Sequence, residues 1–438
     1  MSPRQYLTSG QREVRTSHMD SITTSASKAR PLLGNRPFRR LWAAQFISIA
    51  AVYAVTLAGI TLVEELAHST ALNAVTLVSA ILPAFMGSLV SGTVVDRLGR
   101  VRVLLVSIVA WTLAALAFWA ASGALPPTWA VLTVFATNTT LALVTQFAMS
   151  AEYALLPDYV ARAHLLQANT MFQISLVAGE GLGAILLGPF LIKATGIPSV
   201  GLAAVVLCLL ALALAYNLPR DETRTRQPSS EGRHWAALTS DLRAGWQAII
   251  QDRVLGLVAI QATVAASLLL ILIALLPGLA SRSLGIGAEN MPFLLLPGGL
   301  GFILGLIVAN RWEGRLSRLA WICWGLAALG LGIGLLAVAS GSPPLQGLML
   351  ASFIVIGLGL ALAIIPARTV LQERPPAEVR GRVISAQLAL ANAAAVLPLL
   401  LGGSLADQIG IQPVLILMAL VAGAAGLAGS RMAREQST

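Results

Sequence analysis

Long apolar runs alternate with short polar connections along almost the whole chain of 438 residues. A helix that crosses a bilayer needs about 20 consecutive, mainly apolar residues, so each run of this length predicts one membrane-spanning helix. Proline or glycine marks many of the ends of these runs. Twelve runs qualify, near residues 41–62, 72–95, 102–121, 128–150, 165–190, 197–218, 254–276, 292–310, 318–340, 345–365, 381–405 and 411–430.

The basic residues indicate which ends of these spans face the cytoplasm, because cytoplasmic loops are enriched in Lys and Arg. With the N-terminus inside, 27 of the 29 basic residues fall in cytoplasmic segments, and only Lys193 and Arg282 fall outside. The pattern predicts an all-α membrane protein of twelve transmembrane helices with both termini in the cytoplasm. We expect the protein to be a multi-pass protein of the bacterial plasma membrane.

Composition supports a membrane protein and argues against other classes. Charged residues make up 11% of the chain and apolar residues 57%, whereas soluble domains carry roughly 25% charged residues. The net charge of +10 is scattered between apolar runs, which is unlike the basic face of a nucleic-acid-binding protein. Two cysteines in apolar runs and four histidines in polar connections have no metal-ligand spacing. We therefore expect no metal, no cofactor and no nucleic-acid partner.

Polar segments divide the chain into two sets of six spans. Residues 1–36 predict a disordered cytoplasmic tail, and residues 431–438 a short second tail. Residues 37–218 and 254–430 predict two six-helix bundles. Between them, residues 219–253 predict a cytoplasmic linker whose second part is an amphipathic helix at the membrane surface.

The two halves also share local sequence. GTVVDRLGR at 92–100 has a looser partner in GLIVANRWEGR at 305–315. LLPDYVARAHLLQAN at 155–169 pairs similarly with LQERPPAEVRGRVISAQ at 371–387. Two matches at about the same offset favour duplication of a six-helix unit, which is a known transporter plan. The alternative is chance similarity between loops that must be basic in any case.

GTVVDRLGRVR at 92–102 resembles a signature of the major facilitator superfamily, Gly-x-x-x-Asp-Arg-x-Gly-Arg-Arg, between its helices two and three. The second basic residue is displaced by one position, to Arg102. RLWAAQFIS at 40–48, RGRVIS at 380–385 and GGSLADQIG at 402–410 resemble the branch of macrolide-type efflux pumps and siderophore exporters. The resemblance implies alternating-access transport, outward and powered by a proton gradient.

The charged motif itself suggests a mechanical element. Gly92 permits close approach of a neighbouring helix, and Asp96 can accept hydrogen bonds from the N-terminus of a facing helix. In the family such a cluster acts as a cytoplasmic latch between the two bundles, so Gly92, Asp96, Arg97, Gly99 and Arg100 are the latch candidates. A purely topogenic basic loop is the alternative, although it explains neither the acid nor the glycines.

Glu180 is the one carboxylate that the predicted spans place away from their ends. An ionised carboxylate costs roughly 2.5–3.5 kcal/mol at a helix centre, so Glu180 is the candidate for proton coupling or substrate contact. A protonated glutamate that only ties two helices together is the alternative. The acid that relatives often carry in helix one is absent here, because Ala51 and Val52 stand there. In-span polar residues supply the cavity candidates: Gln45, Tyr53, Asn138, Gln146, Gln173, Gln261 and Asn392.

These observations lead to one functional hypothesis and several alternatives. We expect a monomeric secondary transporter that exports a lipophilic or amphiphilic small molecule, such as a drug, a macrolide or a siderophore. Transport of a lysophospholipid, another lipid or a dedicated metabolite is the alternative within the same class. A polytopic membrane enzyme would need catalytic residues clustered at one interface, and no such group stands out.

Overall fold

The computed structural model describes residues 32–161, 164–219, 243–283, 285–312, 315–340, 346–376 and 379–435, in which every regular element is helical. The α-helices are α2 (Arg36–Ala67), α3 (Thr70–Leu98), α4 (Arg100–Ala124), α5 (Pro127–Tyr159), α6 (Leu165–Gly181), α7 (Gly188–Thr195), α8 (Ile197–Tyr216), α10 (Arg253–Gly278), α11 (Met291–Arg311), α12 (Arg318–Ser340), α13 (Gln346–Glu373), α14 (Arg380–Ile409) and α15 (Ile411–Glu435). Shorter elements are the 3-10 helices η2 (Leu32–Gly34) and η6 (Ala288–Asn290) and the π-helical segments η4 (Leu182–Leu187) and η5 (Leu279–Ser283).

The prediction of twelve membrane spans is confirmed within this described part of the chain. The fifth span consists of α6, η4 and α7, and the seventh consists of α10 and η5. Most of the predicted tail 1–36 and of the predicted linker 219–253 lies outside the described residues. Of the linker's predicted amphipathic helix, residues 243–251 are described and helical, with Ile249 buried in the core of the C-terminal half.

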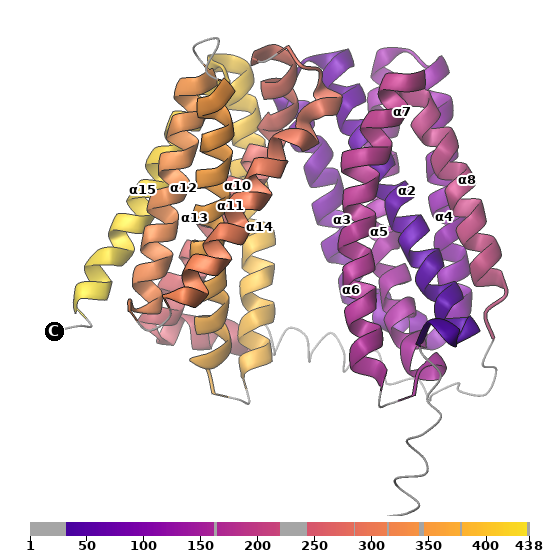
Figure 1. The fold of residues 1–438 in the computed structure, drawn as a ribbon, viewed down its shortest axis with the longest axis horizontal. Coiled ribbons are helices and arrows are strands. Elements are labelled where there is room, and N and C mark those ends of the chain that lie inside the picture. The colour runs from indigo at the N-terminus through magenta and orange to yellow at the C-terminus, as the bar shows by residue number, and fades with distance from the viewer. Residues whose placement is uncertain are drawn as a thin grey trace, which may run out of the picture.

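Two six-helix halves stand side by side (Figure 1), α2 to α8 in one and α10 to α15 in the other. Each half has its own hydrophobic core. We call the end of the bundle at which α8 ends and α10 begins the linker face, and the opposite end the far face. The halves meet at the far face, and their ribbons diverge towards the linker face.

Close packing at the far face joins the two halves. Leu57, Ile60 and Ala74 belong to the N-terminal half but pack into the hydrophobic core of the C-terminal half. Gly403 of α14 lies so close to α3 that a Cβ there would stand 2.8 Å from the carbonyl oxygen of Thr70. The interface therefore depends on a small residue on α14, as helix pairs in membranes often do.

Several helices extend farther than the apolar runs predicted, and this corrects one expectation. The run predicted to end at residue 150 continues as α5 to Tyr159, so Glu152 lies within this helix and is only 3% exposed. Likewise α13 continues to Glu373 and includes Arg368. The prediction that Glu180 is the single in-span carboxylate is therefore wrong, because α5 continues beyond its apolar run into a more polar segment that includes Glu152.

Candidate functional site

The chain reverses sharply at the far face and presents the N-terminus of α3 to the other half. His68 ends α2 in the left-handed conformation, with φ 48° and ψ 36°. Ser69 then caps α3, its Oγ accepting a hydrogen bond from the backbone N–H of Leu72 at 3.2 Å. The first N–H groups of any helix lack partners within the helix and carry partial positive charge. The α3 N-terminus is thus prepared for an anionic partner.

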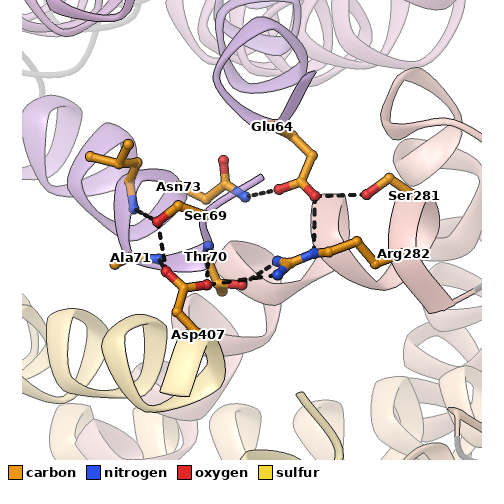
Figure 2. A network of polar contacts seen from close by, with 9 residues as sticks. Glu64, Ser69, Thr70, Ala71, Asn73, Ser281, Arg282 and Asp407 are labelled. Carbon is orange, nitrogen blue, oxygen red and sulfur yellow. Dashed lines mark hydrogen bonds and ion pairs between the residues drawn. The ribbon is translucent and has the colours of Figure 1, made fainter. Parts of the chain in front are cut away.

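Asp407, near the C-terminal end of α14, is that partner (Figure 2). Its carboxylate accepts hydrogen bonds from the backbone N–H groups of Thr70 at 2.7 Å and Ala71 at 3.0 Å. It also accepts one from the Ser69 hydroxyl at 2.6 Å. All three bonds run from the N-terminal half to the C-terminal half, so Asp407 links the two halves directly.

A second carboxylate completes the network from the opposite half. Glu64 of α2 is 1% exposed and accepts hydrogen bonds from Asn73 Nδ2 and from Ser281 Oγ, both at 2.7 Å. The guanidinium of Arg282 lies between the two acids, with Nε 3.2 Å from Glu64 and Nη1 3.7 Å from Asp407. Arg282 also donates a hydrogen bond to the Thr70 hydroxyl. We call Glu64, Ser69, Thr70, Ala71, Asn73, Ser281, Arg282 and Asp407 the far-face gate.

Local backbone geometry supplies the donors from the C-terminal half. Ser281 and Arg282 lie in the π-helical segment η5, which follows Pro277 in α10. A π-helical turn shifts the following side chains around the helix axis relative to a continuous α-helix, and such turns are frequent at functional sites. A separate contact lies elsewhere on the far face, where Lys193 Nζ donates to Asn290 Oδ1 at 2.5 Å. Polar contacts therefore join the two halves at the far face both in the gate and between Lys193 and Asn290.

Glu180 and Tyr53, two residues singled out from the sequence, lie together in the N-terminal half. The Tyr53 hydroxyl lies close enough to the Glu180 carboxylate for the two groups to interact electrostatically. Close helix packing holds them there, since a Cβ on Gly183 would overlap the Ala50 carbonyl oxygen of α2. Directly after Gly181 the helix becomes π-helical. Gly181, the residue after Glu180, has no atom within 4 Å of a Cβ built on it.

The other cavity candidates fall into two groups. Gln45, Asn138 and Gln261 are buried and bond a neighbouring helix, through Ser175 at 2.7 Å, the Thr76 carbonyl at 3.4 Å and the Ala425 carbonyl at 3.1 Å. These three thus connect neighbouring helices. Gln173 is exposed and donates to the Tyr153 hydroxyl at 2.7 Å, and Gln146 is half-buried. The Asn392 side chain lies outside the described residues.

The predicted latch lies at the linker face, where α3 turns into α4 through Gly99 with φ +89°. Asp96 is exposed and has no ion-pair or hydrogen-bond partner among the described residues. Arg100 pairs with Asp158 of the same half at 2.5 Å. No atom lies within 4 Å of a Cβ built on Gly92, so the expected close helix approach is absent there. Its counterpart Gly305 does pack closely, against α13.

Sequence reasoning missed the far-face gate. One signal was present: Arg282 is one of only two basic residues on the side predicted to face outside. Asp407 lies in GGSLADQIG, which the resemblance singled out without giving this residue a role. Glu64 gave no signal, because it stands beside the equally acidic Glu65, which is exposed and takes no part in the gate. Glu152 was missed for a different reason, namely the underestimated length of α5.

Comparison with known proteins agrees with this architecture. The sequence profile described as Major Facilitator Superfamily matches residues 41–397 and, in a second match, residues 298–436. Among curated proteins, no sequence matches significantly. Solved structures with the same fold include the nucleoside transporter NupG, with TM-score 0.70 and 14% identity over 90% of this chain and 98% of that one.

Two further solved structures extend the comparison. A bacterial homologue of the iron transporter ferroportin, in an inward-facing state, has TM-score 0.70 and 17% identity and covers 92% of this chain and 100% of its own. The peptide transporter POT, solved as a mutant in complex with sulfate, has TM-score 0.68 and 15% identity over 93% of this chain and 96% of its own. At these identities the similarity establishes the fold.

Proposed function

The chain belongs to the major facilitator superfamily, and we propose that it exports a lipophilic or amphiphilic small molecule by alternating access, driven by the proton gradient. Membership makes it a multi-pass membrane transporter rather than an enzyme. The direction of transport, the substrate class and the coupling ion are the proposed part. The solved structures with this fold are described as nucleoside, peptide and iron transporters.

The far-face gate carries the alternating-access part of the proposal. Hydrogen bonds and an ion pair join the halves there (Figure 2). At the linker face, Asp96 is exposed, and the ribbons of the two halves diverge (Figure 1). The positive-inside rule assigns the linker face, with most of the basic residues, to the cytoplasm. We therefore assign the structure to the conformation open to the cytoplasm. In the opposite conformation the gate separates, and the latch around Asp96 holds the linker face closed.

The neighbourhood of Glu180 supports the substrate and coupling part. Glu180 and Tyr53 place a titratable carboxyl and a phenol between α2 and α6, beside glycine-packed backbone. A carboxyl group that binds a proton in one conformation and releases the proton in the other couples proton flow to transport. On α6 and α5, Gln173 and Tyr153 add a neutral amide and a phenol, which are hydrogen-bonded to each other. Such surroundings suit an apolar or amphiphilic substrate better than a highly charged one.

A transport assay tests the proposal. Cells with and without the gene are loaded with fluorescent lipophilic cations and macrolides, with and without an uncoupler. We expect lower accumulation in cells that carry the gene, and loss of this difference with the uncoupler. Glu180→Gln should abolish the pH dependence of export, whereas Glu65→Gln, an exposed acid outside the gate, should leave it unchanged. Equal accumulation across the panel contradicts the proposed substrate class and favours a lipid or a dedicated metabolite.

A further inference from the structure

A narrow apolar slot of 330 Å³ opens between α3 and α4 near the linker face. Val94 and Leu98 of α3, Val106 and Ala110 of α4, and Phe147 of α5 are among the residues that line it. Leu98 and Val106 are 60% and 68% exposed. In a membrane-spanning helix, exposed aliphatic side chains of this kind contact lipid.

The slot exists because α3 and α4 diverge. The turn at Gly99, with φ +89°, connects them directly, yet α3 packs mainly against α5, and α4 packs against α5 and α8, rather than against each other. Residues of α3, α4 and α5 line the space between them, and the side chains of the described residues leave it unfilled. Val106 and Ala110 lie one and two helical turns beyond Arg102, about 6 and 12 Å deeper at 1.5 Å per residue. The slot thus extends from the end of the span into the hydrocarbon region.

Arg102 is the one charged residue that lines the slot, and it lies at the slot's shallow end. Its side chain is exposed and has no carboxylate partner among the described residues, whereas nearby Arg100 pairs with Asp158. A basic residue at position 101 could not reach the slot, because Val101 is 6% exposed and packs in the core of the N-terminal half. Displacing the basic residue of the motif by one position rotates it by about 100° around α4. This rotation places the charge at the slot.

We propose that this slot binds an anionic phospholipid of the leaflet at the linker face. One acyl chain occupies the apolar slot, and the phosphate pairs with the Arg102 guanidinium. Arginine suits phosphate because its planar fork can donate two parallel hydrogen bonds. The anionic lipids of a cytoplasmic leaflet supply a ligand that combines this charge with an apolar chain. The site does not depend on which substrate the protein transports.

Native mass spectrometry of the detergent-solubilised full chain tests the site. The protein is titrated with phosphatidylglycerol or phosphatidylcholine of identical acyl chains. We expect one phosphatidylglycerol to bind about fivefold more tightly than phosphatidylcholine, the effect of one basic residue near an anionic headgroup. Arg102→Gln should remove this preference. Arg253→Gln, which changes an exposed arginine at the start of α10, should retain it.

A second variant separates the acyl chain from the headgroup. Ala110→Phe fills the slot and should weaken binding of both lipids equally. If it does not purify as a monodisperse protein, Val106→Phe fills the same slot from its exposed side. Free glycerol phosphate should not compete, because it lacks the acyl chain. Unchanged preference in Arg102→Gln, equal loss in Arg253→Gln, or competition by glycerol phosphate each overturns the proposal.

Discussion

Replacing Asp407 with alanine tests whether the far-face gate sets the balance between the two conformations. The change removes three hydrogen bonds that cross between the halves, of 2.6, 2.7 and 3.0 Å. Hydrogen bonds to a charged group contribute about 1.5 kcal/mol each at the lower end of the usual range, about 4.5 kcal/mol in all. The Asp407 side chain is 25% exposed, so water competes with the protein donors for hydrogen bonds to its carboxylate. We therefore expect about half of this sum, ~2 kcal/mol, which corresponds to a roughly 30-fold shift towards the open far face.

Cysteine accessibility measures this shift. Ile60 is 7% exposed and packs from the N-terminal half into the core of the C-terminal half, so opening of the far face exposes it. The reporter is Ile60→Cys in a chain whose buried Cys208 and Cys323 are replaced by alanine. A membrane-impermeant maleimide is added from outside the cell, and the labelling rate is followed. The rate should rise roughly 30-fold in Asp407→Ala.

The control removes a carboxylate that joins elements of a single half. Glu373 pairs with Arg318 at the linker face, and both belong to the C-terminal half. Glu373→Ala should therefore leave the labelling rate of the reporter unchanged. An unaltered rate in Asp407→Ala, or an equal rise in both variants, refutes the view that Asp407 holds the far face closed.

Two further predictions concern the linker face. Asp96→Asn should reduce transport while membrane insertion and abundance stay nearly normal, because it removes the charge of the latch; undiminished transport in a quantified vesicle assay contradicts the latch. Asp252 caps α10 and pairs with Arg374 at 2.5 Å. Burial pushes its pKa up, but hydrogen bonds from Arg374, Leu255 and Val254 outweigh burial and hold the pKa below the ordinary 3.8. A lowered pKa stabilises the fold above the ordinary value and loses this contribution as the pH falls through the lowered one. The melting temperature of Asp252→Asn should thus lie below that of the wild type at pH 7, and the two should converge only below pH 3.8, as the pH falls through the lowered pKa; a constant difference contradicts the assignment.

The sequence predicted the spans well because membrane insertion is a local property. About 20 apolar residues suffice to specify a span whatever the rest of the chain does. The ends of the helices were less predictable, since a helix continues wherever its polar residues find water, headgroups or partners. This is why Glu152 and Arg368 were assigned to loops although α5 and α13 include them.

The sequence identified the members of one polar pair on neighbouring helices but not the fact that they pair. Glu180 could be recognised because a carboxylate in a long apolar run is costly, and Tyr53 was a polar residue in another run. Their proximity could not be deduced, because it depends on how α2 packs against α6 and, through Gly183, against η4. The roles of Gln45 and Gln261 as ties between helices likewise required the packed structure.

By itself, the sequence determined the class of the protein and its twelve spans. It also predicts two related halves and an orientation set by the arginines. Only the tertiary structure decided which charges meet. Ser69 and Asp407 are 338 residues apart, and Glu64 and Ser281 are 217 apart. Their contacts arise because two independently packed halves close against each other at one end of the bundle. The hydropathy of a span depends only on neighbouring residues along the chain. An ion pair between the halves depends on how whole helices are placed, and local sequence patterns do not specify this placement.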